Sequence, residues 1–207
     1  MENCEYCAEF RRGYLGVQEI GNRIVYETNN FVVFPSLGQI VEGYLIIAPK
    51  NHYICIGGIP EELYSELEDM QQKVRKILEE SYTTPLFFEH GPVSSSRKGG
   101  SCIDHAHFHA VPVKLDIFND LSRDFPTRSV NSYTDLKMQF EKGIPYFYLE
   151  DNLGKRYLFE IEDQVPSQYI RRLIASKINN HEKWDWGIYL GLDELVRTLE
   201  KLKGRFE

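Results

Sequence analysis

The sequence predicts an α+β protein: a five-stranded antiparallel sheet with one long helix, followed by a C-terminal α+β extension. Two patterns predict this fold class. Short apolar segments bounded by turn residues, with alternation where one face is polar, are typical of strands, because successive strand side chains point to opposite faces. One long segment with apolar residues three and four apart is typical of a helix. The 207 residues suit a single domain with a substantial extension.

Five segments in the first half of the chain have strand character. The first two are joined by a turn at Asn29 and Asn30, and Pro49 ends the third. The predicted strands are 23–28, 31–34, 43–52, 85–91 and 101–113.

A long helix is predicted between the third and fourth strands, over residues 60–81. Pro60 opens it, and Glu61 and Glu62 lie in its first turn, where the helix dipole favours negative charge. Its apolar stripe consists of Leu63, Leu67, Met70, Val74, Ile77 and Leu78.

The chain changes character beyond about residue 115. Segment 145–163 is predicted to be a hairpin that turns at 152–154. Helices are predicted at 132–143, 167–178 and 192–203. Because no flexible linker separates the two parts, we expect a domain at 1–115 with the extension 116–207 packed onto it.

Composition excludes several classes of protein. The net charge of −7 argues against a non-specific nucleic-acid binder. No apolar run is long enough for a membrane span, and residues 1–13 lack the apolar core of a signal peptide, so we expect a cytoplasmic protein. Four cysteines, two of them spaced as Cys4-x-x-Cys7, suit a metal site better than a disulfide framework.

The segment 101–113 places three of the six histidines in strict alternation with apolar residues. On a strand, His105, His107 and His109 would form one line, with neighbours roughly 6–7 Å apart. The residues between and after them would face a core: Ala106, Phe108 and Ala110.

Such a line of imidazoles favours two kinds of chemistry. Histidines two apart on a strand can share a metal ion. A neutral imidazole can also attack a phosphorus centre while its neighbours hold phosphate oxygens. The Gly/Ser-rich loop 91–101 directly before the histidines favours phosphate, since its backbone N–H groups and hydroxyls suit oxyanions, and Arg97 and Lys98 add positive charge.

These motifs together resemble the histidine triad superfamily of nucleotide hydrolases and transferases. HAHFHAV at 105–111 resembles the triad signature, and GYLIIAPKNH at 43–52 resembles the strand upstream of it. GGSC at 99–102 is similar to the family's phosphate loop, and CEYC at 4–7 to the Cys-x-x-Cys of many bacterial members. The resemblance covers residues 1 to about 115, with all blocks in the expected order.

The resemblance implies roles for individual residues. His107 would be the nucleophile that attacks an α-phosphate, His109 would stabilise the phosphate, and His105 would support the site. The implied substrate-binding residues are Ser36 on the ribose, together with Tyr44, Arg97, Lys98, Gly100, Ser101 and Cys102. A histidine at position 109, where the transferase branch has glutamine, favours hydrolysis. A homodimer is also implied.

The resemblance further implies a structural zinc ion. Cys4 and Cys7 would supply two ligands, and His52 and His105 would complete the tetrahedron. This ion would tie the N-terminal segment to the triad and orient the neighbouring histidines.

Two departures from the family keep other functions open. Tyr44 stands where a histidine is usual, and Cys102 stands where serine or threonine is usual, with a thiol being the weaker hydrogen-bond donor. The alternatives are a nucleotide-binding or sensing protein with little turnover, a nucleotidyl transferase or phosphorylase, and a metal-dependent hydrolase with all three triad histidines as ligands.

Other conspicuous residues receive structural interpretations. His90 is expected to be structural, with a place facing the site as the alternative, Cys55 to pack in the core, and His181 to be solvated. Trp184 and Trp186 are expected to pack against the core, with base stacking as the alternative. The pair Arg171 and Arg172 is expected on a helix surface.

Overall fold

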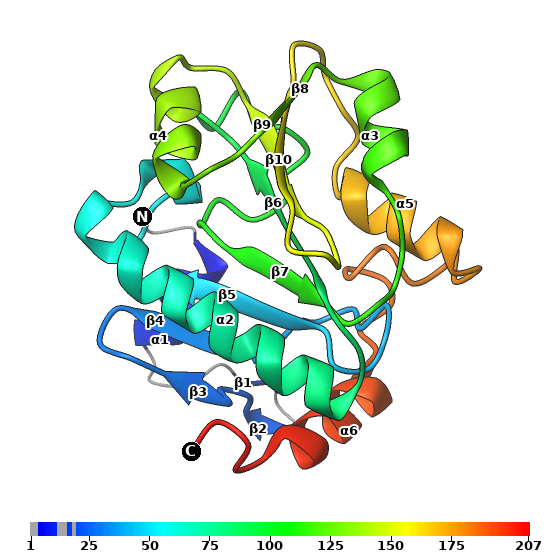
Figure 1. Ribbon diagram of the computed structural model, residues 1–207. Helices are drawn as coiled ribbons and strands as arrows, with labels where there is room; N and C mark the ends of the chain where they lie inside the picture. Colours follow the sequence, from blue (N-terminus) through cyan, green and yellow to red (C-terminus); the bar gives the residue numbers. More distant parts are fainter. Residues whose placement is uncertain (1–3, 12–15, 18–19) are drawn as a thin grey trace.

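The structure is a computed structural model that describes residues 4–11, 16–17 and 20–207. Within these ranges, eight strands form one antiparallel sheet in the order β3-β4-β5-β7-β6-β9-β10-β8 (Figure 1). The strands are β3 (Tyr26–Glu27), β4 (Phe31–Pro35), β5 (Leu45–Pro49), β6 (Leu86–Gly91), β7 (Phe108–Val111), β8 (Thr127–Ser129), β9 (Tyr146–Glu150) and β10 (Arg156–Glu160). A separate pair is formed by β1 (Gly16–Val17) and β2 (Gly21–Asn22).

Six helices and two 3₁₀ turns are found in the same ranges. The helices are α1 (Glu5–Arg11), α2 (Tyr64–Ser81), α3 (Phe118–Asp124), α4 (Tyr133–Glu141), α5 (Tyr169–Lys177) and α6 (Leu192–Leu202). The 3₁₀ turns are η1 (Ile56–Gly58) and η2 (Glu61–Leu63), and η2 leads directly into α2.

The five strands expected from the sequence lie together as β3-β4-β5-β7-β6, and their antiparallel pairing is confirmed. The sheet then continues into the C-terminal region, because the β9–β10 hairpin pairs along β6 and supplies hydrogen-bond partners to what would otherwise be an exposed edge. In this register His90 lies opposite Phe147.

The expected line of three histidines on one strand is wrong in part. Only His109 belongs to β7, while His105 and His107 precede it. The cause is a change of hydrogen-bond partner: the Ala106 N–H donates to the carbonyl of Tyr53, 2.6 Å away, instead of joining the ladder.

Both faces of the sheet are covered, which explains why its central strands are buried throughout. On one face, α2 and α4 enclose a core that includes Ala106, Phe108 and Ala110, as expected. The apolar stripe of α2 is confirmed, since its Leu67, Met70, Val74, Ile77 and Leu78 are buried there and Leu63 packs beside them. On the other face, α1, α3 and α5 contribute Tyr6, Leu121 and Ile174 to a second core. Figure 1 shows α2 running across the sheet.

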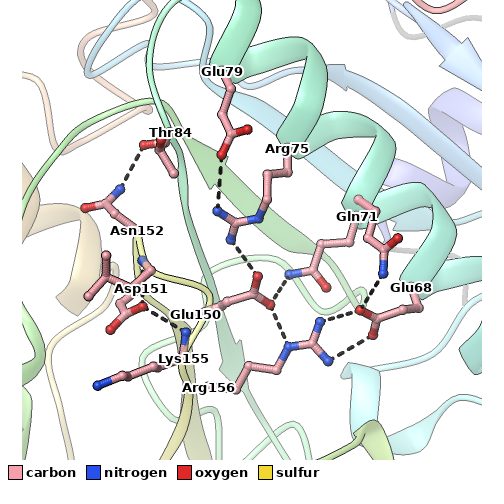
Figure 2. A network of polar contacts seen from close by, with 12 residues as sticks. Glu68, Gln71, Arg75, Glu79, Thr84, Glu150, Asp151, Asn152, Lys155 and Arg156 are labelled. Atoms are coloured by element: carbon pink, nitrogen blue, oxygen red, sulfur yellow. Dashed lines mark hydrogen bonds and ion pairs between the residues drawn. The ribbon is translucent and has the colours of Figure 1, made fainter.

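A network of paired charges joins α2 to the β9–β10 hairpin, and we call it the α2–hairpin network (Figure 2). The Glu150 carboxylate accepts hydrogen bonds from Gln71 at 2.9 Å, Arg75 at 2.5 Å and Arg156 at 2.7 Å. Arg156 also donates two hydrogen bonds to Glu68, at 2.9 and 2.5 Å. Every charge in this network therefore meets an opposite charge.

We searched the described residues for a membrane-crossing helix and found none with sufficient length and apolar character.

Candidate active site and metal centre

His107 is buried, with 5 % of its surface exposed, and its two ring nitrogens have different environments. Its Nδ1 lies 2.6 Å from the carbonyl oxygen of His105, which can only accept a hydrogen bond. Burial lowers the pKa of His107 to about 4, against the opposing effect of that carbonyl. The ring is therefore neutral at pH 7, with its proton on Nδ1 and a free electron pair on Nε2.

His109 lies beside His107, with ring centroids 4.5 Å apart, and is held from two sides. Phe88 stacks on its ring at 4.3 Å, and the Tyr44 hydroxyl lies 2.7 Å from its Nδ1. Burial raises the pKa of Tyr44 to about 12, so the phenol keeps its proton. Burial, followed by the neighbouring His107, lowers the pKa of His109 well below its ordinary value.

A pocket opens against His107 and His109, and several residues predicted from the sequence line it. These are Ser36, Gly100, Ser101 and Cys102. The Ser36 hydroxyl donates to the Leu37 carbonyl at 2.8 Å, and the Ser101 hydroxyl donates to the Ile103 carbonyl at 2.9 Å. Both oxygens therefore have lone pairs, and the backbone of the 99–102 turn supplies polar groups to the wall.

Three residues from the predicted substrate-binding set lie elsewhere. Tyr44 is fully buried behind His109, does not line the pocket, and contacts the triad through its hydroxyl. Arg97 and Lys98 are exposed, and they contact the Gly143 carbonyl and Asp104, respectively. Because those partners draw both cations away from the triad, the loop's positive charge is absent from the pocket wall.

The largest surprise is Arg171, which was expected on a helix surface. It is 2 % exposed and lines the pocket together with Gln168 and Trp186 of the same C-terminal segment. The buried residues of α5 are Ile170, Arg171, Ile174 and Ala175. Their helical spacing places Arg171 on the apolar face, a signal that was available in the sequence.

Other lining residues were also missed or underestimated. His90 is 5 % exposed, lines the pocket, and accepts a hydrogen bond from the backbone N–H of Ile170 at 3.3 Å. Arg23 also lines the pocket and is 2 % exposed, but it forms an ion pair with Glu9 at 3.3 Å. Tyr6 of α1 packs edge-on against His105 and His107, with centroids 5.7 and 5.6 Å away.

The two tryptophans differ in their surroundings. Trp184 packs against the second core as expected, with the Arg172 guanidinium 3.5 Å from its ring centroid. Trp186 instead lines the pocket, and its Nε1–H donates to the Cys102 sulfur at 3.2 Å.

A second cluster lies next to the triad, where four possible metal ligands converge. One ligand atom from each of Cys4, Cys7, His52 and His105 lies within 4.8 Å of all the others. Nδ1 of His105 is 3.4 Å from the Cys4 sulfur and 3.5 Å from the Cys7 sulfur, and Nδ1 of His52 is 3.3 Å from the Cys7 sulfur. Zinc with ordinary bond lengths separates S and N ligands by about 3.5 Å in a tetrahedron.

The second ring nitrogen of His105 supports this interpretation. Its Nε2 lies 2.7 Å from the carbonyl oxygen of Pro49, which fixes the proton there and leaves Nδ1 free for a metal. The arrangement of two thiols and two imidazoles is therefore compatible with zinc.

The alternative in which all three triad histidines bind one metal fits poorly. Across the described part of the chain, the Cys4–Cys7–His52–His105 set is the only group of three or more candidate ligands that converges. His105 directs Nδ1 toward the two cysteines and Nε2 toward the Pro49 carbonyl, so neither of its nitrogens is left for an ion shared with His107 and His109.

Residues 15–120, just over half of the chain, match the family described as "Scavenger mRNA decapping enzyme C-term binding". The chain therefore belongs to this family of histidine triad proteins.

Curated relatives are distant and mostly longer. CWF19-like protein 1 of Mus musculus is 23 % identical over 162 residues, which cover 72 % of this chain and 28 % of that protein. The chain thus spans less than a third of the length of that relative. The adenosine 5′-monophosphoramidase of Candida albicans is 28 % identical over 98 residues, which cover 46 % of this chain and 64 % of the enzyme.

Solved structures of histidine triad proteins are also similar. A hypothetical histidine triad nucleotide-binding protein from Sulfolobus tokodaii is 19 % identical, covers 68 % of this chain and 91 % of its own, and has a TM-score of 0.44. A zinc-bound histidine triad family protein from Mycobacterium smegmatis is 18 % identical, covers 56 % and 79 %, respectively, and has a TM-score of 0.44.

Proposed function

We propose that the protein is a nucleotide hydrolase that acts at the α-phosphate through a nucleotidyl intermediate on His107. The observation that carries this proposal is the state of the His107 ring: neutral, protonated on Nδ1 toward the His105 carbonyl, and placed in a pocket beside a second imidazole. A neutral imidazole with a free Nε2 pair is a competent nucleophile.

In the first step, His107 Nε2 forms a bond to the α-phosphorus, and the bond from phosphorus to the leaving oxygen or nitrogen breaks. The His105 carbonyl, 2.6 Å from Nδ1, stabilises the positive charge that develops on the imidazole. We assign the proton of the Tyr44–His109 pair to the phenol, which leaves His109 protonated on Nε2 and able to donate to the leaving group.

In the second step, water attacks the phosphorus, and its proton replaces the Nε2 proton that His109 gave to the leaving group in the first step. The bond to His107 breaks, and a nucleoside monophosphate leaves. Ser36 contacts the ribose in this proposal, and the 100–102 turn contacts the phosphate, in agreement with their positions in the pocket wall.

The proposed substrates carry a good leaving group on an α-phosphate. Dinucleoside polyphosphates and nucleoside phosphoramidates come first, and the name of the Candida relative supports the latter. The family description refers to mRNA decapping, so a 5′–5′-linked cap dinucleotide is a third substrate of the same chemistry.

Zinc has a structural role in this proposal. Bound by Cys4, Cys7, His52 and His105, the ion would cross-link α1 to the segment that carries the triad. The chain itself positions His107, because the carbonyl that holds its ring belongs to the ligand His105.

The direct test is intact-protein mass spectrometry after brief reaction with diadenosine tetraphosphate or an adenosine phosphoramidate, quenched without acid. Wild type should show an adenylyl adduct and release AMP. His107→Ala should show neither, with turnover reduced at least about 1000-fold. The exposed His181 provides the matched control, since His181→Ala should behave as wild type.

Turnover that persists in His107→Ala would contradict the nucleophile assignment. AMP binding without adduct or turnover in wild type would favour the binding or sensing alternative. Accumulation of adduct that is released only by a phosphate-containing acceptor would favour a transferase or phosphorylase.

A homodimer and a cytoplasmic location complete the proposal. Light scattering after gel filtration measures the first, and cell fractionation the second.

A further inference from the structure

We propose that Arg171, supplied by the C-terminal segment, binds an anionic phosphate group of the ligand in the histidine pocket. The ligand class rests on the function proposed above, while the anion site itself rests on the surroundings of Arg171. This residue lies outside the 15–120 region that matches the family.

Arg171 is a buried cation without a matching anion. Only 2 % of its surface is exposed, and no Asp or Glu of the described chain forms an ion pair with it. A guanidinium group is always charged in proteins. The positive charge therefore persists inside the protein.

Neutral oxygen atoms hold the guanidinium in place instead. Its Nε donates to the Trp184 carbonyl at 2.9 Å and to the Gln168 side-chain oxygen at 3.1 Å. Its Nη2 donates to the Gly38 carbonyl at 2.8 Å. Its Nη2 also donates to the Lys183 carbonyl at 3.5 Å, and Tyr44 is a further uncharged side-chain partner. These contacts fix the orientation of the group without neutralising it, which is the state of a prepared anion receptor.

The guanidinium is also placed next to the triad. Its central carbon lies 5.2 Å from the ring centroid of Tyr44, whose hydroxyl is 2.7 Å from His109. Arg171, His107 and His109 line the same pocket. A phosphate seated against His107 would therefore lie in the field of Arg171.

Three other arginines provide a contrast. Buried Arg23 and the partly buried Arg75 and Arg156 are each paired with at least one glutamate, at 2.5–3.3 Å. Of these four arginines, only Arg171 both lines the histidine pocket and lacks an acidic partner in the described structure.

Gly38 shows how closely the C-terminal segment fits over this site. Its φ of +69° is one that favours glycine, and an added Cβ would lie 2.5 Å from the Trp186 Cβ and 2.7 Å from Arg171 Nη2. The Gly38 N–H also donates to the Leu190 carbonyl at 2.7 Å. The loop after β4 is thus shaped to receive Arg171.

The test compares ligands with and without the anion. Affinities for AMP, adenosine and pyrophosphate are measured by calorimetry on wild type, Arg171→Gln, Arg171→Lys and Arg172→Gln. Arg172 is the matched control, since it is the next residue of α5 but is exposed and contacts the Ser167 carbonyl. Melting temperatures of all four proteins are recorded alongside.

Arg171→Gln should weaken the binding of AMP and pyrophosphate about 10- to 100-fold and leave the affinity for adenosine unchanged, because only the charge-assisted contact with the anion is lost. Arg171→Lys should retain part of the affinity for AMP and pyrophosphate, since an ammonium keeps the positive charge but lacks the bidentate geometry of a guanidinium. Arg172→Gln should match wild type.

Equal losses of affinity for AMP and adenosine would overturn the inference and indicate a structural role for Arg171. Unchanged AMP affinity in Arg171→Gln would also overturn it. If Arg171→Gln does not fold, the affinities of Arg171→Lys for the same ligands provide the comparison. Wild type that binds neither AMP nor pyrophosphate also overturns it. Anion binding that depends on Arg171 without any adenylyl adduct would uphold the inference and reject the hydrolase proposal.

Discussion

The α2–hairpin network and Arg171, which lie on opposite faces of the sheet, differ in how charge is balanced. On the face covered by α2, the α2–hairpin network matches Glu150 and Glu68 with Arg75 and Arg156 (Figure 2). On the triad face, Arg171 is held by carbonyl and amide oxygens and meets no carboxylate of the described chain.

This difference distinguishes arginines that stabilise the fold from an arginine that can bind an anionic ligand. A paired arginine has its desolvation offset within the protein, so it contributes to holding elements together. An unpaired buried arginine retains an uncompensated desolvation cost, which a bound anion can offset. Mutation of a paired arginine should lower the stability of the protein, and mutation of the unpaired arginine should lower its affinity for the ligand.

Breaking the network should produce the largest change in stability. Arg156→Met leaves Glu68 and part of Glu150 without their cation, and we expect the free energy of unfolding to fall by about 2–4 kcal/mol. Urea unfolding measures it. Arg197→Met, which breaks the exposed pair with Glu42, should have a much smaller effect on the free energy of unfolding, because solvent screens exposed ion pairs. Equal costs would remove the distinction between the two kinds of pair.

Metal removal should have the next largest effect, on the triad face. We expect purified protein to hold one zinc per chain by elemental analysis. Chelation should lower the melting temperature by about 5–10 °C, because a ligand that binds only the folded state stabilises it. Cys7→Ser should lose the metal, whereas Cys55→Ala, whose thiol lies outside the cluster, should keep it. Zinc retained by Cys7→Ser would reject the assignment.

Glu89 sharpens the comparison, because it is a buried acid that can discharge. Burial raises its pKa to about 8, while hydrogen bonds from the Ile56 N–H and the Tyr146 hydroxyl oppose the shift. The neutral form is therefore native near pH 7. Its stabilising effect is fully present below pH 4.5, the ordinary value, and is lost as pH rises through about 8.

Wild type should therefore lose up to about 3 kcal/mol of unfolding free energy between about pH 5.5 and pH 8, relative to Glu89→Gln. The glutamine resembles the neutral acid and cannot titrate. Urea unfolding of both proteins at the two pH values makes the measurement. Parallel pH profiles would contradict a raised pKa at Glu89.

The smallest expected effect concerns Tyr44. Tyr44→Phe removes the hydroxyl that orients His109 and should lower kcat about 5- to 10-fold, since one hydrogen bond contributes about 1 kcal/mol. KM should change little, because Tyr44 does not line the pocket. Tyr82→Phe, which removes a phenol hydroxyl outside the histidine pocket, is the control. A rise in KM at constant kcat would place Tyr44 against substrate after all.

Local sequence patterns predicted much of the fold for a clear reason. The stripe of α2, the apolar runs of β4 and β5 and the alternation at β7 are set by which neighbouring residues are apolar, and the sequence predicts all of them. The hairpin at β9 and β10 was recognised too, but its pairing with β6 was not, since strand partners far apart in sequence leave no local signal.

The candidate site divides in the same way. The triad and the four possible zinc ligands were identified through short motifs and the family they resemble, and the structure brings the four ligands together. Arg97 and Lys98 were placed at the site by their nearness in sequence, but nearby partners hold both outside the pocket. The charge of Arg171 alone predicts a surface position, whereas its spacing from the apolar residues of α5 places it on the buried face.

Local patterns thus predicted the fold class, five strands, the long helix and the cluster of histidines, all of which depend on residues close together in the chain. What surrounds the histidines follows only from the tertiary structure. Gly38 and Arg171 are 133 positions apart, yet one carbonyl oxygen and one guanidinium nitrogen lie 2.8 Å from each other. Burial and the absence of an acidic partner turn that arginine from a surface charge into a candidate receptor, and both properties arise only when distant segments pack.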